Sequence, residues 1–85
     1  HAASTANAGI LAEIDRLEKL RERAFRELDD LNVRMETCRN NFNSGDRFLQ
    51  GFWGKELEAA AAKSKETEQE VEALEVRIYE LRKSL

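Results

Sequence analysis

The chain has 85 residues, of which 36% are charged and 41% apolar, with a formal net charge of −3 and no proline. A chain of this length forms at most one small domain and buries a modest share of its surface. Basic and acidic residues are mixed along the sequence and the pI is near 5.2, so we expect no nucleic-acid partner. No run approaches the roughly 20 apolar residues that cross a bilayer, so we expect no membrane association.

One cysteine, Cys38, and one histidine, His1, limit the chemistry that the chain can carry. A single cysteine forms no internal disulfide, which favours a reducing compartment, and we expect a cytoplasmic protein. One histidine and one cysteine cannot assemble a metal site, and no carboxylate has a histidine beside it to act as an acid or base. We therefore expect no enzymatic activity, no cofactor, no metal and no small-molecule substrate.

Two segments precede the turn. Residues 1–8 are small and polar, without the apolar core of a signal peptide, and we expect a flexible N-terminal segment or a remnant of cloning. Residues 9–43 are predicted to form the first coiled-coil helix, because apolar residues recur there in steps of three and four. The predicted heptad a positions are Ile14, Arg21, Leu28, Met35 and Phe42, and the d positions are Ile10, Leu17, Ala24, Leu31 and Cys38.

A turn and a second helix follow. Residues 44–54 form a region rich in glycine and aromatic residues, and residues 55–85 are predicted to form the second coiled-coil helix. Gly45 can adopt the left-handed conformation that ends a helix, and Asp46 is a suitable N-cap for the next one. The second heptad series has a positions at Leu57, Ser64, Val71, Ile78 and Leu85, and d positions at Trp53, Ala60, Thr67, Leu74 and Leu81.

The charges beside the two heptad series favour a hairpin over a single long rod. A parallel, in-register dimer would oppose like charges at nearly every edge pair, such as Glu13 with Glu18. Folding back at Gly45, so that facing residue numbers add up to about 88, brings opposite charges together, whereas a register near 95 brings like charges together. The expected attractive pairs are Glu13–Arg77, Glu27–Lys63 and Arg34–Glu56. We predict an all-α fold, an antiparallel helical hairpin.

A second apolar face is expected outside the seam. Leu20 and Phe25 widen the apolar stripe of the first helix, and the alanines of 59–62 offer a smooth strip on the second. A stripe wider than one seam is typical of bundles, so we expect the hairpin to associate with further helices, its own or those of another protein. Scattered surface apolar residues are the alternative interpretation. Because Leu81 and Leu85 continue the heptad to the last residue, we expect the chain to be a fragment of a longer protein.

The aromatic residues gather at the turn, where Phe48, Phe52 and Trp53 stand beside Gly51 and Gly54. They either close the end of the hairpin or project from it as a binding patch, and insertion of the tip into a membrane, with only Arg47 and Lys55 to supply positive charge, is a third alternative. Aromatic residues with a neighbouring arginine are the types that carry binding energy at protein interfaces. The candidate protein-binding residues are Leu20, Phe25, Phe48, Phe52 and Trp53.

A helical hairpin with tryptophan and glycine at its turn resembles the WXG-type proteins of bacterial type VII export. Here the motif reads Phe52–Trp53–Gly54, with the tryptophan directly before the glycine, and Tyr79 is followed four residues later by Lys83 where an acidic residue is expected. The chain departs from both family motifs, so we do not assign it to that family.

Three functional interpretations remain at this stage. The leading one is a non-enzymatic coiled-coil module for protein–protein interaction or assembly, a scaffold or adaptor that binds helices. A small helical hairpin that serves as substrate or chaperone of a bacterial secretion system is the alternative from another class. A spacer rod that provides only length is the third.

Overall fold

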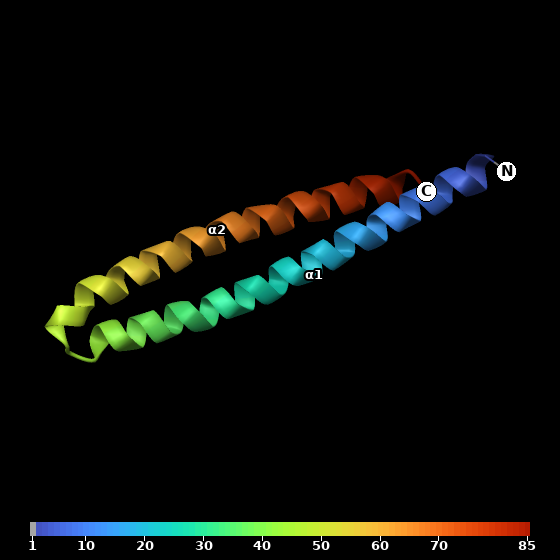
Figure 1. Cartoon of the computed structure of the whole chain (residues 1–85). Helices are drawn as coiled ribbons and strands as arrows, with labels where there is room; N and C mark the ends of the chain where they lie inside the picture. The colour runs from blue at the N-terminus through green and yellow to red at the C-terminus, as the bar shows by residue number, and fades with distance from the viewer. Residues whose placement is uncertain (1) are drawn as a thin grey trace.

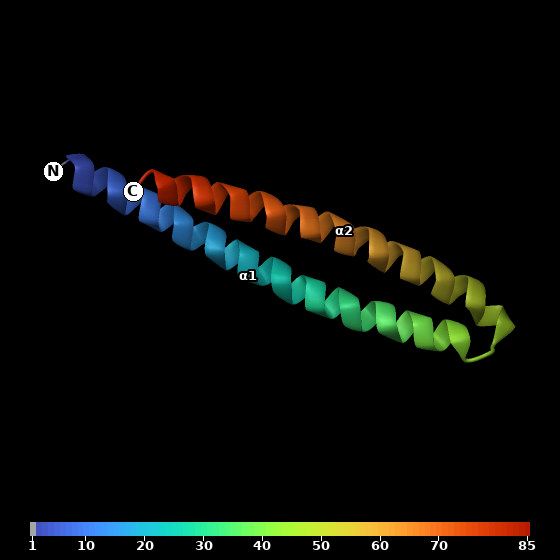
Figure 2. The same cartoon turned by 180° about the vertical axis from the view of Figure 1, so that it is seen from behind.

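The computed structural model describes residues 2–85 and shows two long helices packed side by side in opposite directions (Figure 1). Helix α1 spans Ala2–Asn43 and helix α2 spans Arg47–Lys83. The molecule measures 68 × 14 × 12 Å, and the view from behind shows the same pair without a third layer (Figure 2). The predicted all-α antiparallel hairpin is confirmed.

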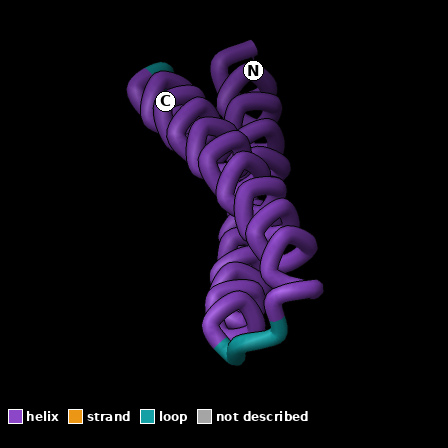
Figure 3. Tube along the Cα trace, turned by 90° about the vertical axis from the view of Figure 1, so that its left-hand side faces the viewer, coloured by secondary structure: helices purple, strands orange, loops and turns teal. Residues whose placement is uncertain are grey.

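The core is the predicted heptad seam between the two helices. The buried residues all occupy predicted a or d positions, and the helices cross at a shallow angle so that one stripe of each remains in contact (Figure 3). Ile14, Leu17 and Ile78 form a buried apolar cluster near the open end of the hairpin. The buried residues are Ile14, Leu17, Ala24, Cys38, Ala60, Ser64, Thr67, Val71 and Ile78.

Small residues occupy the middle of this seam, where Ala24, Ala60 and Ser64 are buried. Thr67 is fully buried, and its hydroxyl donates a hydrogen bond of 2.9 Å to the carbonyl oxygen of Lys63 one turn earlier. A buried hydroxyl without a partner would be destabilising, and this bond within the helix satisfies it. The seam therefore combines a large apolar cluster at one end with a narrow centre.

The connection between the helices depends on two residues that the sequence predicts. Gly45 has φ +96°, a left-handed conformation that is rarely open to other residues. Asp46 has extended backbone angles and its carboxylate accepts a 3.0 Å hydrogen bond from the amide of Phe48, as an N-cap does. The helix stop and the helix start are thus set by adjacent residues.

We expect Gly45→Ala and Gly51→Ala to change stability in opposite directions. Alanine at position 45 must adopt the left-handed conformation, which costs about 1–2 kcal/mol. Position 51 lies inside α2 with open space around it. Alanine there only reduces the backbone entropy of the unfolded chain, and it stabilises the folded hairpin by about 0.5–1 kcal/mol. Urea unfolding followed by circular dichroism measures both. Equal effects of the two substitutions would contradict this conformation of the turn.

Both helices begin earlier than the sequence interpretation expects. Helix α1 starts at Ala2 instead of residue 9, because alanine is the strongest helix former and four alanines occur before Gly9. His1 lies outside the described residues. Helix α2 starts at Arg47 instead of residue 55, directly after its cap, so the connection comprises only residues 44–46 of the expected 44–54.

Two predicted ion pairs join the helices along one edge of the seam, which we call the Lys63 flank. Lys63 lies 3.9 Å from Glu27, and Arg34 donates a hydrogen bond to Glu56. This hydrogen bond raises the pKa of Arg34. The third predicted partner of this edge, Glu13, instead pairs with Arg16 of its own helix.

The opposite edge, the Arg82 flank, corrects the predicted register. Arg82 donates a hydrogen bond of 3.1 Å to Glu18, and these numbers add up to 100, whereas both pairs of the Lys63 flank add up to 90. On the two sides of an antiparallel seam, the paired edge residues are displaced in opposite directions from the residues that lie level with each other. The numbers of level residues therefore add up to the mean of 90 and 100, about 95. The predicted value of 88 was wrong, because each g residue can reach either of two residues across the seam and pairs with the oppositely charged one.

This register places the first turn of α2 beyond the end of α1. Figure 1 shows the start of α2 beyond the end of α1, and the C-terminus beside α1 short of the N-terminus. The ring of Phe42, in the last turn of α1, lies 3.7 Å from the place that a Cβ atom at Gly54 would occupy, and the side-chain amide of Gln50 donates a 3.3 Å hydrogen bond to the carbonyl oxygen of Phe42. The beginning of α2 therefore overhangs the hairpin.

Candidate interaction surfaces

Apolar side chains gather at the turn end of the hairpin, on the last turn of α1 and the first turns of α2, and we call this group the aromatic tip: Phe42, Phe48, Leu49, Phe52 and Trp53. Phe48 is 96% exposed and Phe52 is 51% exposed. These two residues are four positions apart on a helix, so they share one face. Phe48 and Phe52 therefore present apolar surface to the surroundings.

Part of the aromatic tip does close the end of the seam. Trp53 is half-buried at a d position, and its ring meets that of Phe52 edge-on, with centroids 5.0 Å apart and an interplanar angle of 76°. The ring of Phe42 lies beside Gly54, where a Cβ atom would be 3.7 Å from it, an ordinary van der Waals distance. Trp53 therefore lies at the end of the seam, whereas Phe48 and Phe52 are exposed beside it.

The two other predicted binding residues lie on opposite edges of the hairpin. Leu20 precedes Glu27 by one heptad and so lies on the Lys63 flank, half-buried against the core cluster. Phe25 follows Glu18 by one heptad and lies on the Arg82 flank, where it is 44% exposed. The expected single face formed by Leu20, Phe25 and the alanines of 59–62 is not formed, because g and e positions project to different sides of the seam.

A shallow apolar groove runs along the Lys63 flank, and we call it the central groove. It has a volume of about 360 Å³ and is lined by Leu20, Ala24, Glu70, Ala73 and Leu74. Apolar carbon makes up most of its lining. The groove is open because the side chains of Ala24 and Ala73 are too short to fill the space between two leucines. The groove is the natural place for another helix to approach this hairpin closely.

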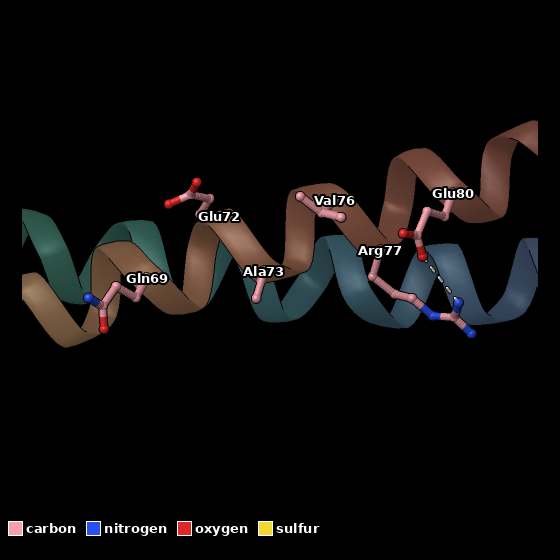
Figure 4. A pocket seen from close by; sticks show the side chains of 6 residues that line it. All are labelled: Gln69, Glu72, Ala73, Val76, Arg77 and Glu80. Carbon is pink, nitrogen blue, oxygen red and sulfur yellow. Dashed lines mark ion pairs between the residues drawn. The ribbon is translucent and has the colours of Figure 1, made fainter.

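A separate depression, which shares Ala73 with the central groove, lies on the exposed side of α2 (Figure 4). Gln69, Ala73 and Arg77 follow one another along one side of the helix, and Val76 lies beside them. Arg77 pairs with Glu80 at 3.6 Å. The pKa of the Glu13 carboxyl is lowered mainly by its hydrogen bond from Arg16, and the positive charge of Arg77 lowers it further. The rim of the groove is thus charged while its floor is apolar.

Phe25 lies in a second depression, on the Arg82 flank, among residues of α1 that are mainly charged. Its carboxylates are already paired within the chain. Lys19 contacts Asp15 at 2.9 Å, and Glu18 accepts from Arg82. This depression is therefore more polar than the central groove and offers a single large apolar side chain.

The chemistry-bearing residues are separated in space. Cys38 is 1% exposed in the seam, as a small apolar residue at a d position would be. Among residues 2–85, no three histidine, cysteine, aspartate or glutamate side chains come together as metal ligands would. Neither described helix combines the length and the apolar character that crossing a membrane requires.

Comparisons with known proteins give no match to this chain, whether made against family models, curated proteins or solved structures.

Sequence reasoning missed the central groove, although its signal was present. Ala73 and Leu74 are neighbouring c and d residues. On the other helix, Leu20 and Ala24 occupy g and d positions one helical turn apart. These positions border the same edge of an antiparallel seam, so a helical-wheel comparison of both helices would have brought them together.

Proposed function

We propose that this hairpin is a non-enzymatic protein–protein interaction module, a scaffold or adaptor whose aromatic tip and central groove bind helices of a partner. The single observation that carries the proposal is the almost complete exposure of Phe48 at the overhanging start of α2, with Phe52 half-exposed one turn later. Exposed aromatic side chains held on a rigid helix lose little conformational freedom on binding, and aromatic residues dominate the energetics of protein interfaces.

The surroundings of the tip support a protein ligand. Arg47 and Lys55 border the aromatic residues, and Asp46 is engaged in capping the helix. An apolar centre with a charged rim is the composition of a protein-binding site. A helix that lays its apolar stripe across the tip would cover Phe48, Leu49 and Phe52 together.

The secretion-system hairpin stays the second candidate, because an exposed aromatic tip also suits recognition by transport machinery. The two functions differ in what the tip binds. A scaffold tip binds amphipathic helices in isolation, whereas a transport signal requires the machinery. A spacer rod has no use for Phe48, whose exposure is almost complete.

Selection of amphipathic helical peptides from a display library on the immobilised hairpin tests the proposal. We expect selected peptides to shift the fluorescence of Trp53, the only tryptophan, because it lies within the tip. Phe48→Asp and Phe52→Asp should each weaken their binding by about tenfold to a hundredfold, as removal of an interface hot spot does.

Tyr79→Asp is the matched control, since Tyr79 is an aromatic residue of the same helix, 61% exposed and remote from the tip. Binding should be unchanged by this substitution. If no peptides are enriched, or if the enriched peptides tolerate both phenylalanine substitutions, the tip is not a helix-binding surface.

A further inference from the structure

We propose that a second copy of this chain covers the central groove, giving an antiparallel dimer of four helices with an aromatic tip at each end. The inference rests on the proposed role as an interaction module and names the partner of one of its two surfaces. Three independent features of the hairpin support it: its excess surface, the position of the groove and the charges on the rim.

The hairpin exposes more surface than a compact protein of its mass. Its accessible surface is 6393 Å². A globular monomer of 9.8 kDa exposes about 5,200 Å². The difference, roughly 1,200 Å², is of the size that one partner buries in a stable interface, about 800 Å² or more. Pairing two hairpins along their length would bring the module to the surface expected of a compact fold.

The central groove lies at mid-length, which suits a two-fold arrangement. Leu20 and Ala24 are in the middle of α1, which spans Ala2–Asn43. A two-fold axis through the groove and perpendicular to the helices therefore overlaps the two copies along most of their length. Ala73 lies near this axis, where its small side chain permits close approach of the two α2 helices.

The charges on the rim of the groove select the antiparallel orientation. Glu70 and Arg77 stand at equal distances on either side of the boundary between Ala73 and Leu74. A two-fold axis at that boundary places Glu70 of each copy against Arg77 of the other. A parallel pair would instead oppose Glu70 to Glu70 and Arg77 to Arg77, which complementary interfaces avoid. Among the described residues Glu70 has no ion pair, so it is available to a second copy.

The Arg82 flank lacks these features. Its carboxylates already have partners within the chain, Asp15 with Lys19 and Glu18 with Arg82. Among the described charged residues that line the depression there, only Arg21 is without an ion pair, and a second copy seated there would cover one large apolar side chain, Phe25. The central groove is therefore the self-association surface.

Sedimentation equilibrium across a hundredfold range of concentration, on the whole chain, measures the dimer. We expect a wild-type dimer whose dissociation constant rises at least tenfold in Ala73→Glu, because two carboxylates then meet at the axis. Position 73 is exposed in the hairpin and glutamate is a good helix former, so the single hairpin stays folded. Ala62→Glu, the same change on the same helix but away from the groove, is the matched control and should leave the dimer intact.

A charge exchange tests the orientation. Glu70→Arg and Arg77→Glu should each raise the dissociation constant by about tenfold, since each replaces two attractive pairs by two repulsive ones. The double variant restores the pairing and should return to the wild-type value. An equimolar mixture of the two single variants should also regain affinity, because a copy with arginine at both positions then pairs with a copy that has glutamate at both.

Three results would overturn the inference. They are a wild-type monomer at every concentration, a dimer insensitive to Ala73→Glu, and a dimer dissolved by Phe25→Glu on the Arg82 flank. The proposed function is judged separately, by peptide binding at Phe48 and Phe52. A monomer whose tip binds helices would refute only the dimer, and a dimer with an inert tip would refute only the tip.

Discussion

Replacing Ile78 by alanine is expected to lower the free energy of unfolding by about 2–5 kcal/mol. Ile78 is 1% exposed and shares its cluster with Ile14 and Leu17. Two helices that meet along one seam have no second layer that could move in to fill the cavity. Because small domains are stable by only about 5–15 kcal/mol, this loss is a large part of the total. Urea unfolding at one protein concentration, followed by circular dichroism, measures it.

Val33→Ala is the control for this substitution. Val33 is 65% exposed and lies outside the seam, so its truncation should change stability by about 0.5 kcal/mol or less. Similar losses at positions 78 and 33 would mean that the cluster around Ile78 is not the centre of stability.

The thiol of Cys38 is expected to react with a disulfide reagent such as DTNB on the order of a hundredfold more slowly in the folded protein than in urea. Cys38 is 1% exposed in the seam near the aromatic tip. A buried thiol reacts only when the structure opens locally, and an opening free energy of about 3 kcal/mol suppresses the rate by that factor. The measurement therefore reports whether the two helices stay closed at this end.

A variant that combines Cys38→Ala with Val33→Cys provides the comparison. Position 33 is exposed, so its thiol should react at nearly the same rate in both conditions. If Cys38 in the folded chain reacts as fast as that exposed thiol, the seam is open near the turn and the hairpin does not hold its register there.

The features set by local chemistry could be predicted from the sequence. Apolar residues at heptad spacing identified the buried seam, including Cys38 and Ile78, because a helix face is fixed by periodicity alone. The turn was predictable for a similar reason. Gly45 permits a left-handed conformation and Asp46 caps a helix wherever they occur.

The register and the surfaces that depend on it could not be predicted in this way. Like and opposite charges alternate along the edges, so Glu27 and Arg34 find partners in more than one alignment of the helices. Each exposed pair contributes only a few tenths of a kcal/mol, too little to decide between them. The overhang of α2, and with it the exposure of Phe48, follows from the register.

The two binding surfaces fit together in one assembly. An antiparallel dimer through the central groove directs the two aromatic tips to opposite ends, about as far apart as the hairpin is long, which is 68 Å. Two binding sites on one rigid body bind a paired target more tightly than either alone when the spacing matches. The module would then connect two partners, as a scaffold does.

The dependence of thermal unfolding on protein concentration tests the central claim, that the hairpin is an assembly module completed by further helices. Association that requires the folded state raises the unfolding midpoint as concentration increases. We predict a midpoint that climbs by several degrees over a hundredfold range in the wild type and stays constant in Ala73→Glu. A wild-type midpoint that is the same at every concentration would contradict the account and identify a hairpin that is stable alone.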